Sequence, residues 1–157
     1  MKKIFAIIFF LLIGSLCFSQ SPVEEVEIFQ NLFGMKKKDA VSRLIKIDGM
    51  KSESFWKLYD EYEMERKSFG KDRIQLVNDY ANNYLQMTDD KIDELFKRSV
   101  IVSGNLDKLA VKYYKKIKKE VDTKTAAQFY QVEMYFLSAI RYELTSNIPF
   151  IGELESE

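Results

Sequence analysis

Acidic side chains gather in one short stretch of the chain, at Asp60, Glu61, Glu63 and Glu65. Glu61 and Glu65 are four residues apart, so in a helix they share one face. Two such carboxylates could hold a hard cation or work as an acid pair. Basic residues stand close by in the sequence, and a solvated, charge-balanced helix surface is the simpler interpretation.

The other residues that enzymes rely on are scarce. The chain has no histidine, which removes the commonest general base, the usual nucleophile–histidine pairs and the usual zinc sites. It also lacks a glycine-rich phosphate loop, and its hydroxyl groups have no base beside them in the sequence. We therefore expect no enzymatic activity, no cofactor and no bound metal.

Three charged residues interrupt apolar helix faces: Arg66, Arg73 and Glu133. If the chain reverses direction near residues 88 and 122, Arg66 comes level with Glu133. A buried charge is far less costly when it is paired. The sequence thus predicts a structural ion pair between Arg66 and Glu133, with Tyr62 or Tyr113 donating to the carboxylate. Alternatively, the long arginine stems cover the apolar helix face and their guanidinium groups reach solvent.

The elements that must position these charges are helices. Between Pro22 and Pro149 there is no proline, which is typical of an all-helical domain. The longest stripe has the three- and four-residue spacing of one helix face. Its large apolar residues are Phe55, Leu58, Tyr59, Tyr62, Phe69, Leu76, Val77, Tyr80, Tyr84 and Met87. A helix of this length needs companions along it to cover the stripe.

Helix starts follow from capping residues. We expect the first helix near Pro22, with a break at Gly34, and the long second helix after a cap at Ser52 or Ser54. Thr88 should cap the third helix, and Asp122 or Thr123 the fourth. Short linkers favour antiparallel neighbours. The sequence thus predicts an all-α fold, an elongated antiparallel bundle of about four helices, as a single domain spanning residues 20–157.

The first nineteen residues look like a cleaved signal peptide. Two lysines precede an apolar run that is too short for an ordinary membrane span of about 20 residues. Small residues at Cys17 and Ser19 place the cleavage site after Ser19, and an uncleaved anchor is the alternative. We expect a periplasmic protein, exported through a Sec-type signal peptide, with no stable membrane span after cleavage.

Removal of this leader changes the composition in two ways. The chain has 24 basic and 24 acidic residues, and the leader holds two lysines, so the remaining chain has a net charge of −2. Nothing in it resembles the basic footprint of a nucleic-acid-binding protein. Cys17 is the sole cysteine and leaves with the leader, so the core must stabilise the fold without a disulfide.

Surface groups that could bind a partner come next. Trp56, Tyr114 and Tyr130 fall beside the best apolar stripes, so they are candidates for a partly exposed, partner-binding aromatic surface. Core packing is the alternative for each. The basic run of residues 36–38 is expected to be a solvated turn or helix face.

Several patterns resemble known families. The residues that carry the resemblance are Phe55-Trp56-x-x-Tyr59-x-x-Tyr62-Glu63-x-Glu65-Arg66, Asp79-Tyr80, Lys112-Tyr113-Tyr114-Lys115-Lys116, Lys124 to Phe129, and Glu133. They are similar to small exported helical proteins of Gram-negative bacteria without a settled activity. More remotely, residues 50–54 and 121–128 occupy the places of the two helix-starting Leu-Thr-x-x-Gln motifs of the Spy/CpxP (LTxxQ) periplasmic chaperones.

This resemblance implies a Spy-like long hairpin, a homodimer, and binding of unfolded protein clients without nucleotide. The expectation is therefore a non-enzymatic periplasmic protein-binding protein, chaperone-like or involved in envelope stress. The alternative is a structural or regulatory adaptor that docks one specific envelope partner.

Overall fold

The computed structural model describes residues 22–153, with side chains from residue 33 onward. The predicted signal peptide, residues 1–19, lies outside this range. The described chain is helical and has no strand, which confirms the all-α prediction. Its elements are α2 (Pro22–Leu44), α3 (Met50–Asn83), the 3-10 turn η1 (Tyr84–Gln86), α4 (Asp89–Glu120) and α5 (Thr123–Asn147).

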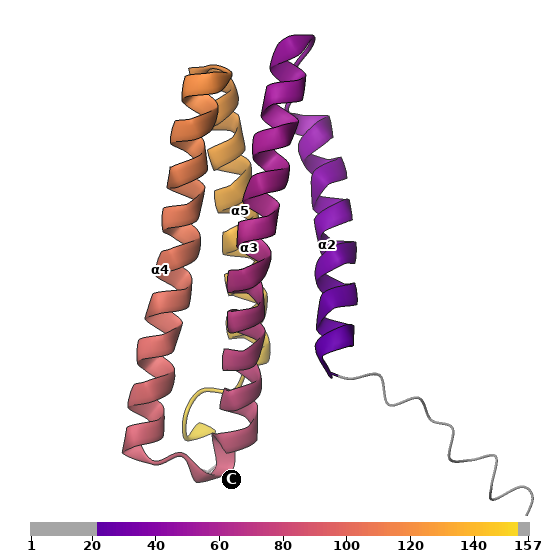
Figure 1. Ribbon diagram of the computed structural model, residues 1–157. Coiled ribbons are helices and arrows are strands. Elements are labelled where there is room, and N and C mark those ends of the chain that lie inside the picture. Colours follow the sequence, from indigo (N-terminus) through magenta and orange to yellow (C-terminus); the bar gives the residue numbers. More distant parts are fainter. Residues whose placement is uncertain (1–21, 154–157) are drawn as a thin grey trace, which may run out of the picture.

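The helices form an up-and-down bundle of uneven height. Helices α3, α4 and α5 lie side by side along the molecule, each antiparallel to the one before it (Figure 1). The shorter α2 packs against α3 and α5 near the α2–α3 turn, and it does not reach the α3–α4 turn. We call the end at the α2–α3 and α4–α5 turns, where all the helices lie together, the four-helix end. At the opposite end, the α3–α4 end, α5 stops short of the turn as α2 does, and the segment after α5 is tied to α3 there (Figure 1).

The capping residues were predicted well for two helices. The side chain of Thr88 accepts a hydrogen bond from the Lys91 amide, and that of Asp122 accepts one from the Thr125 amide. The cap predicted at Ser52 or Ser54 is wrong. Helix α3 begins after Gly49, whose φ of 66° lies in the left-handed region that glycine adopts without strain.

The first helix is longer and more regular than its sequence suggested. The expected interruption at Gly34 is absent, because α2 runs unbroken from Pro22 to Leu44. A single glycine costs a helix only about 1 kcal/mol relative to alanine, and packing against α3 and α5 offsets that cost.

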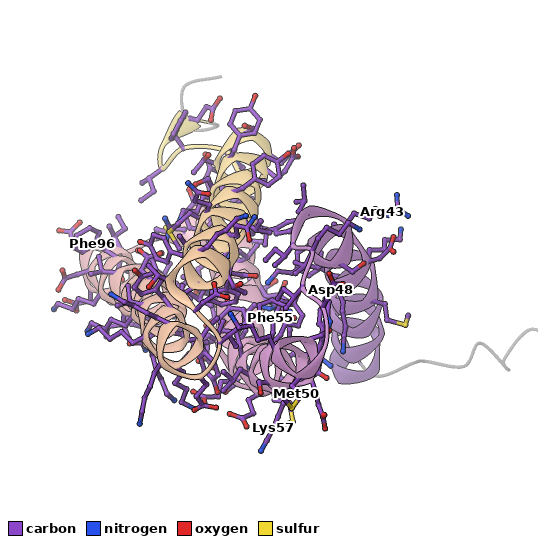
Figure 2. All side chains as sticks on the ribbon, turned by 90° about the horizontal axis from the view of Figure 1, so that it is seen from above. Arg43, Asp48, Met50, Phe55, Lys57 and Phe96 are labelled. Atoms are coloured by element: carbon purple, nitrogen blue, oxygen red, sulfur yellow. The ribbon has the colours of Figure 1, made fainter. Side chains whose placement is uncertain are left out.

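An aromatic core fills the four-helix end. Phe55, Tyr59 and Tyr62 of α3 are fully buried, together with Tyr113 of α4 and Phe129 of α5. The Tyr62 ring meets Tyr113 at 5.4 Å and Phe129 at 5.1 Å between centroids, both edge to face. Seen from above, Phe55 lies among the helices (Figure 2). This confirms that the first half of the α3 stripe faces companion helices.

The buried cluster nearer the α3–α4 end is smaller than the aromatic core. Among the described residues, this cluster consists of Val102, Leu106 and Leu137, with Phe69 and Met134 packed against it. The α3 residues Leu76 and Val77 are only partly buried. Among the side chains that the structure describes, the buried core is therefore smaller towards the α3–α4 turn.

Truncating the aromatic core should be costly. We expect Phe129→Ala to lower the free energy of unfolding by about 3–5 kcal/mol, because the cavity would open between Tyr59 and Tyr62. Urea unfolding followed by circular dichroism measures this change. The control Phe96→Ala, at an exposed position, should change it by about 0.5 kcal/mol or less. Equal effects of the two variants would contradict this description of the core.

Candidate functional site

Five polar side chains meet inside the four-helix end: Lys37 of α2, Tyr62, Glu63 and Arg66 of α3, and Glu133 of α5. We call this group the buried charge cluster. Lys37 and Glu133 are only 2% and 1% exposed, and the other three are also buried. Since two cations face two carboxylates, the cluster is formally neutral.

Lys37 is the centre of the cluster. Its Nζ lies 2.7 Å from Oε1 of Glu63 and 2.6 Å from Oε2 of Glu133, so one ammonium group joins three helices. The same nitrogen lies 5.0 Å from the ring centroid of Tyr62 and 5.6 Å from that of Phe136. Cation–π attraction of this kind adds to the two ion pairs.

The predicted pair between Arg66 and Glu133 is wrong in its partner. Arg66 donates from Nε to both oxygens of Glu63, at 3.0 Å each, and from Nη2 to Oε2 of Glu63 at 2.9 Å. Glu63 is three residues earlier on the same helix face, and Lys37 holds Oε2 of Glu133. The register argument still placed Glu133 correctly, because Tyr62 donates to it at 2.6 Å.

The two carboxyl groups respond differently to their surroundings. Burial raises the pKa of Glu63, but the charges and hydrogen bonds of Lys37 and Arg66 outweigh it and leave the pKa below its usual value. Burial also raises the pKa of Glu133, and Lys37 and Tyr62 offset only part of that increase, so its pKa stays above the usual value. Glu63 has two cationic partners, whereas Glu133 has one.

The position of Lys37 overturns the expectation that residues 36–38 form a solvated basic face. Lys36 is exposed, and Lys38 pairs near the surface with Asp60, but Lys37 points into the core. A sequence signal for this existed. Phe33, Lys37, Val41 and Ile45 are spaced four apart, so Lys37 occupies an apolar face whose later members, Val41 and Ile45, are fully buried.

The acidic pair on α3 is neutralised by α4. Glu65 accepts hydrogen bonds from Lys112 and, at 2.6 Å, from the Tyr113 hydroxyl, while Glu61 pairs with Lys116 at 3.4 Å. Each carboxylate thus has its own partners. In the described part of the chain, no group of three or more acidic or cysteine residues could hold a metal ion.

The three aromatic residues proposed for partner binding do not form one surface. Trp56 packs edge to face on Phe55 and Tyr59. Tyr114 and Tyr130 instead pair with each other across α4 and α5, at 6.0 Å between ring centroids. All three are partly buried against their own chain. Exposed aromatic side chains occur elsewhere, at Phe96, Tyr135, Tyr142 and Phe150.

A groove of about 780 Å³ lies at the α3–α4 end, and we call it the end groove. Its walls come from the end of α3, the start of α4, the end of α5 and the segment after α5. Most of its lining is apolar: Leu76, Val77, Tyr80, Ile92, Leu95, Phe96, Leu144, Ile148, Pro149, Phe150 and Ile151. Asp89, Asp93, Ser99 and Thr145 also line it.

The segment after α5 is tied to α3 through two tyrosines. The Tyr80 hydroxyl donates to the carbonyl of Pro149, and the Tyr84 hydroxyl donates to that of Phe150, each at 2.7 Å. These bonds fix the backbone while the Phe150 side chain stays 74% exposed. Phe96, which lines the groove from α4, is 63% exposed and lies at the outer edge of the bundle (Figure 2).

The fold and these sites define an antiparallel helical bundle that is closed by a buried charge cluster at one end and grooved at the other. Comparison with family models, curated proteins and solved structures found no match for the chain. Among the residues described, no helix is both long enough and apolar enough to cross a membrane.

Removing the central cation should unfold or strongly destabilise the protein. Lys37→Ala leaves Glu133 buried with only a tyrosine as partner, and breaking a buried pair costs about 3–5 kcal/mol. Urea unfolding followed by circular dichroism measures the loss. Lys36→Ala, one residue away and exposed, is the matched control and should cost about 0.5 kcal/mol or less. Similar unfolding midpoints for both variants would contradict the central role of Lys37.

The contributions of Glu63 and Glu133 to folding stability should depend on pH in opposite ways. Because the pKa of Glu63 is lowered on folding, its contribution is present above its unfolded pKa and is lost as pH falls through the folded value. The raised pKa of Glu133 acts in the opposite sense, so its contribution is lost as pH rises through the folded value.

We therefore expect Glu63→Gln to be more destabilising than Glu133→Gln at neutral pH. The difference in unfolding free energy between the two variants should decrease as the pH is lowered below the usual carboxyl pKa of 4.5. Unfolding free energies measured across this range test the expectation. A difference that stays constant or increases in acid would contradict the lowered pKa of Glu63 and the raised pKa of Glu133.

Proposed function

We propose that this protein is a non-enzymatic binding protein of the bacterial envelope that holds exposed apolar segments of other proteins, in the manner of a chaperone. The observation that supports this most directly is the end groove. Its volume of about 780 Å³ has the size of a binding pocket, and its rim keeps Phe96, Phe150 and Ile151 largely exposed. Exposed apolar side chains that surround a groove favour contact with another molecule.

The composition of the groove suits an unfolded client better than a single rigid ligand. Its apolar lining makes few directional hydrogen bonds, so it can accept side chains of different shapes. Phe96 lines the groove from α4 and Phe150 from the segment after α5, so its two exposed rings come from different parts of the chain. Two flat rings facing a client can contact it without a fixed sequence requirement.

The proposed location rests on the sequence alone. A leader of the signal-peptide type would deliver the chain to the periplasm, where no ATP is available. A chaperone there must bind and release clients through surface contacts, as the resemblance to the Spy/CpxP proteins also implies. The end groove fits that requirement, because its use needs no nucleotide site.

An adaptor that docks one specific partner is the second candidate. Helix α5 carries an uncharged outer face in an otherwise charge-rich protein. The exposed residues of this face follow helical spacing: Gln131, Tyr135, Ser138, Tyr142 and Ser146. Interface centres are depleted in charge and enriched in tyrosine, which favours docking of a folded partner on this face.

A client-aggregation assay separates the two candidates. We expect the purified protein, added without nucleotide in equimolar amount, to suppress light scattering by a chemically denatured client. The double variant Phe96→Ser/Phe150→Ser should lose most of this effect, because it removes both rings of the groove rim. Tyr142→Ser removes an equally exposed ring from α5 and should keep the effect.

Circular dichroism of each variant confirms that the bundle is intact before the assay. Absence of suppression by the unmodified protein would refute the chaperone proposal. If crosslinking in the source cell then gives one partner, and that crosslink is lost in Tyr142→Ser but not in the double variant, the adaptor is the better description.

A further inference from the structure

A second cavity lies on the side of the bundle between α3 and α5, and we call it the lateral cavity. Its volume is about 470 Å³. Val77 and Leu144 line both this cavity and the end groove, so these two side chains form the wall between them. The remaining described lining consists of Phe33, Arg66, Gly70, Arg73, Ile74, Asn78, Phe136, Ala139, Ile140 and Glu143.

Most of this lining is apolar, but one arginine in it has an unsatisfied donor. Nη2 of Arg73 is buried and has no hydrogen-bond partner. A buried donor without a partner costs free energy, and a cationic donor costs more. Such groups are rare in native structures, and an absent ligand is one physical explanation for them.

The neighbouring charges do not neutralise Arg73. Arg66 is paired with Glu63, and Arg141 is paired with Asp107 at 2.6 Å. Glu143 lies at the exposed edge of the cavity, where its Oε2 accepts from Asn147 at 3.4 Å. Burial lowers the pKa of Arg73, and the positive charges of Arg141 and Arg66 lower it further, against a smaller opposite effect of Asp107. Nη2 of Arg73 thus lies buried in the cavity wall without a hydrogen-bond partner, while Glu143 contributes a negative charge at the exposed edge.

We propose that the lateral cavity binds a small amphipathic anion, with its apolar chain or ring against Ile74, Phe136 and Ile140 and its carboxylate on Nη2 of Arg73. A guanidinium in an apolar wall is well suited to a carboxylate. The cavity volume falls within the range of small-molecule sites. Gly70 lines the cavity from the α3 side.

The shared chemistry is an alkyl or aryl carboxylate, and dodecanoate is a suitable probe. Isothermal titration calorimetry should detect its binding to the purified protein. The methyl ester has the same chain without the charge, and in a competition assay it should bind at least about tenfold more weakly, because the charged hydrogen bond to Arg73 is lost. A peptide with an apolar C-terminal residue, compared with its amide, tests whether a protein C-terminus is accepted equally well.

Variants locate the binding site. Arg73→Met keeps an apolar stem of similar length and should abolish the preference for the acid over the ester. Lys71→Met, two residues away and exposed on the same helix, is the matched control and should keep it. Gly70→Leu adds a side chain to the cavity wall and should weaken dodecanoate binding, whereas Phe96→Ser in the end groove should not.

Four outcomes would overturn the proposed anion site. Equal affinity for acid and ester in the unmodified protein would show that the chain itself already neutralises Arg73. If Arg73→Met and Lys71→Met reduce the preference for the acid over the ester equally, the acid is attracted nonspecifically to the basic surface. Loss of binding in Phe96→Ser alone would place the ligand in the end groove, and no heat of binding at all would leave the cavity without this function.

Discussion

The position of one lysine ammonium group between two carboxylates is the constraint on which the four-helix end depends. Lys37 reaches Glu63 on α3 and Glu133 on α5, so helix α2 has one longitudinal position in which both ion pairs form. A slip of α2 by one turn would leave two buried charges, Lys37 and Glu133, without an ion-pair partner, because Glu63 would keep only Arg66. Two unpaired buried charges are far more costly than a poorly packed methyl group. The cluster thus specifies where α2 docks, and the aromatic core around Tyr62 and Phe129 supplies the apolar burial.

Helices α2 and α5 both stop short of the α3–α4 turn (Figure 1). Where α2 is present, the stripe of α3 is covered by three neighbours, and its rings are fully buried. Towards the α3–α4 turn, the same stripe continues through Leu76 and Tyr80, which are only partly buried, and the end groove opens there. The segment after α5, tied by Tyr80 and Tyr84, covers part of this region without closing it. Stability and surface for binding are therefore placed at opposite ends of one set of helices.

The two hollows differ in chemistry, and this difference separates the two proposals. The end groove is broad, largely apolar and bordered by exposed rings, which favours varied protein segments. The lateral cavity is smaller and contains a guanidinium nitrogen without a partner, which favours one small anion. Val77 and Leu144 line both hollows.

The sequence by itself determined the helical class, the antiparallel order, the caps at Thr88 and Asp122, and the approximate level of Glu133, because these follow from local spacing and from linker length. Only the tertiary structure decided which charges pair. Arg66 and Lys37 both had carboxylates within reach, and the choice depends on side-chain length and on the angle at which α2 crosses α3, which no local pattern encodes. The two hollows were equally hidden from the sequence, because a cavity is the space left where packed helices diverge, and it arises from the ends of several segments far apart in the chain.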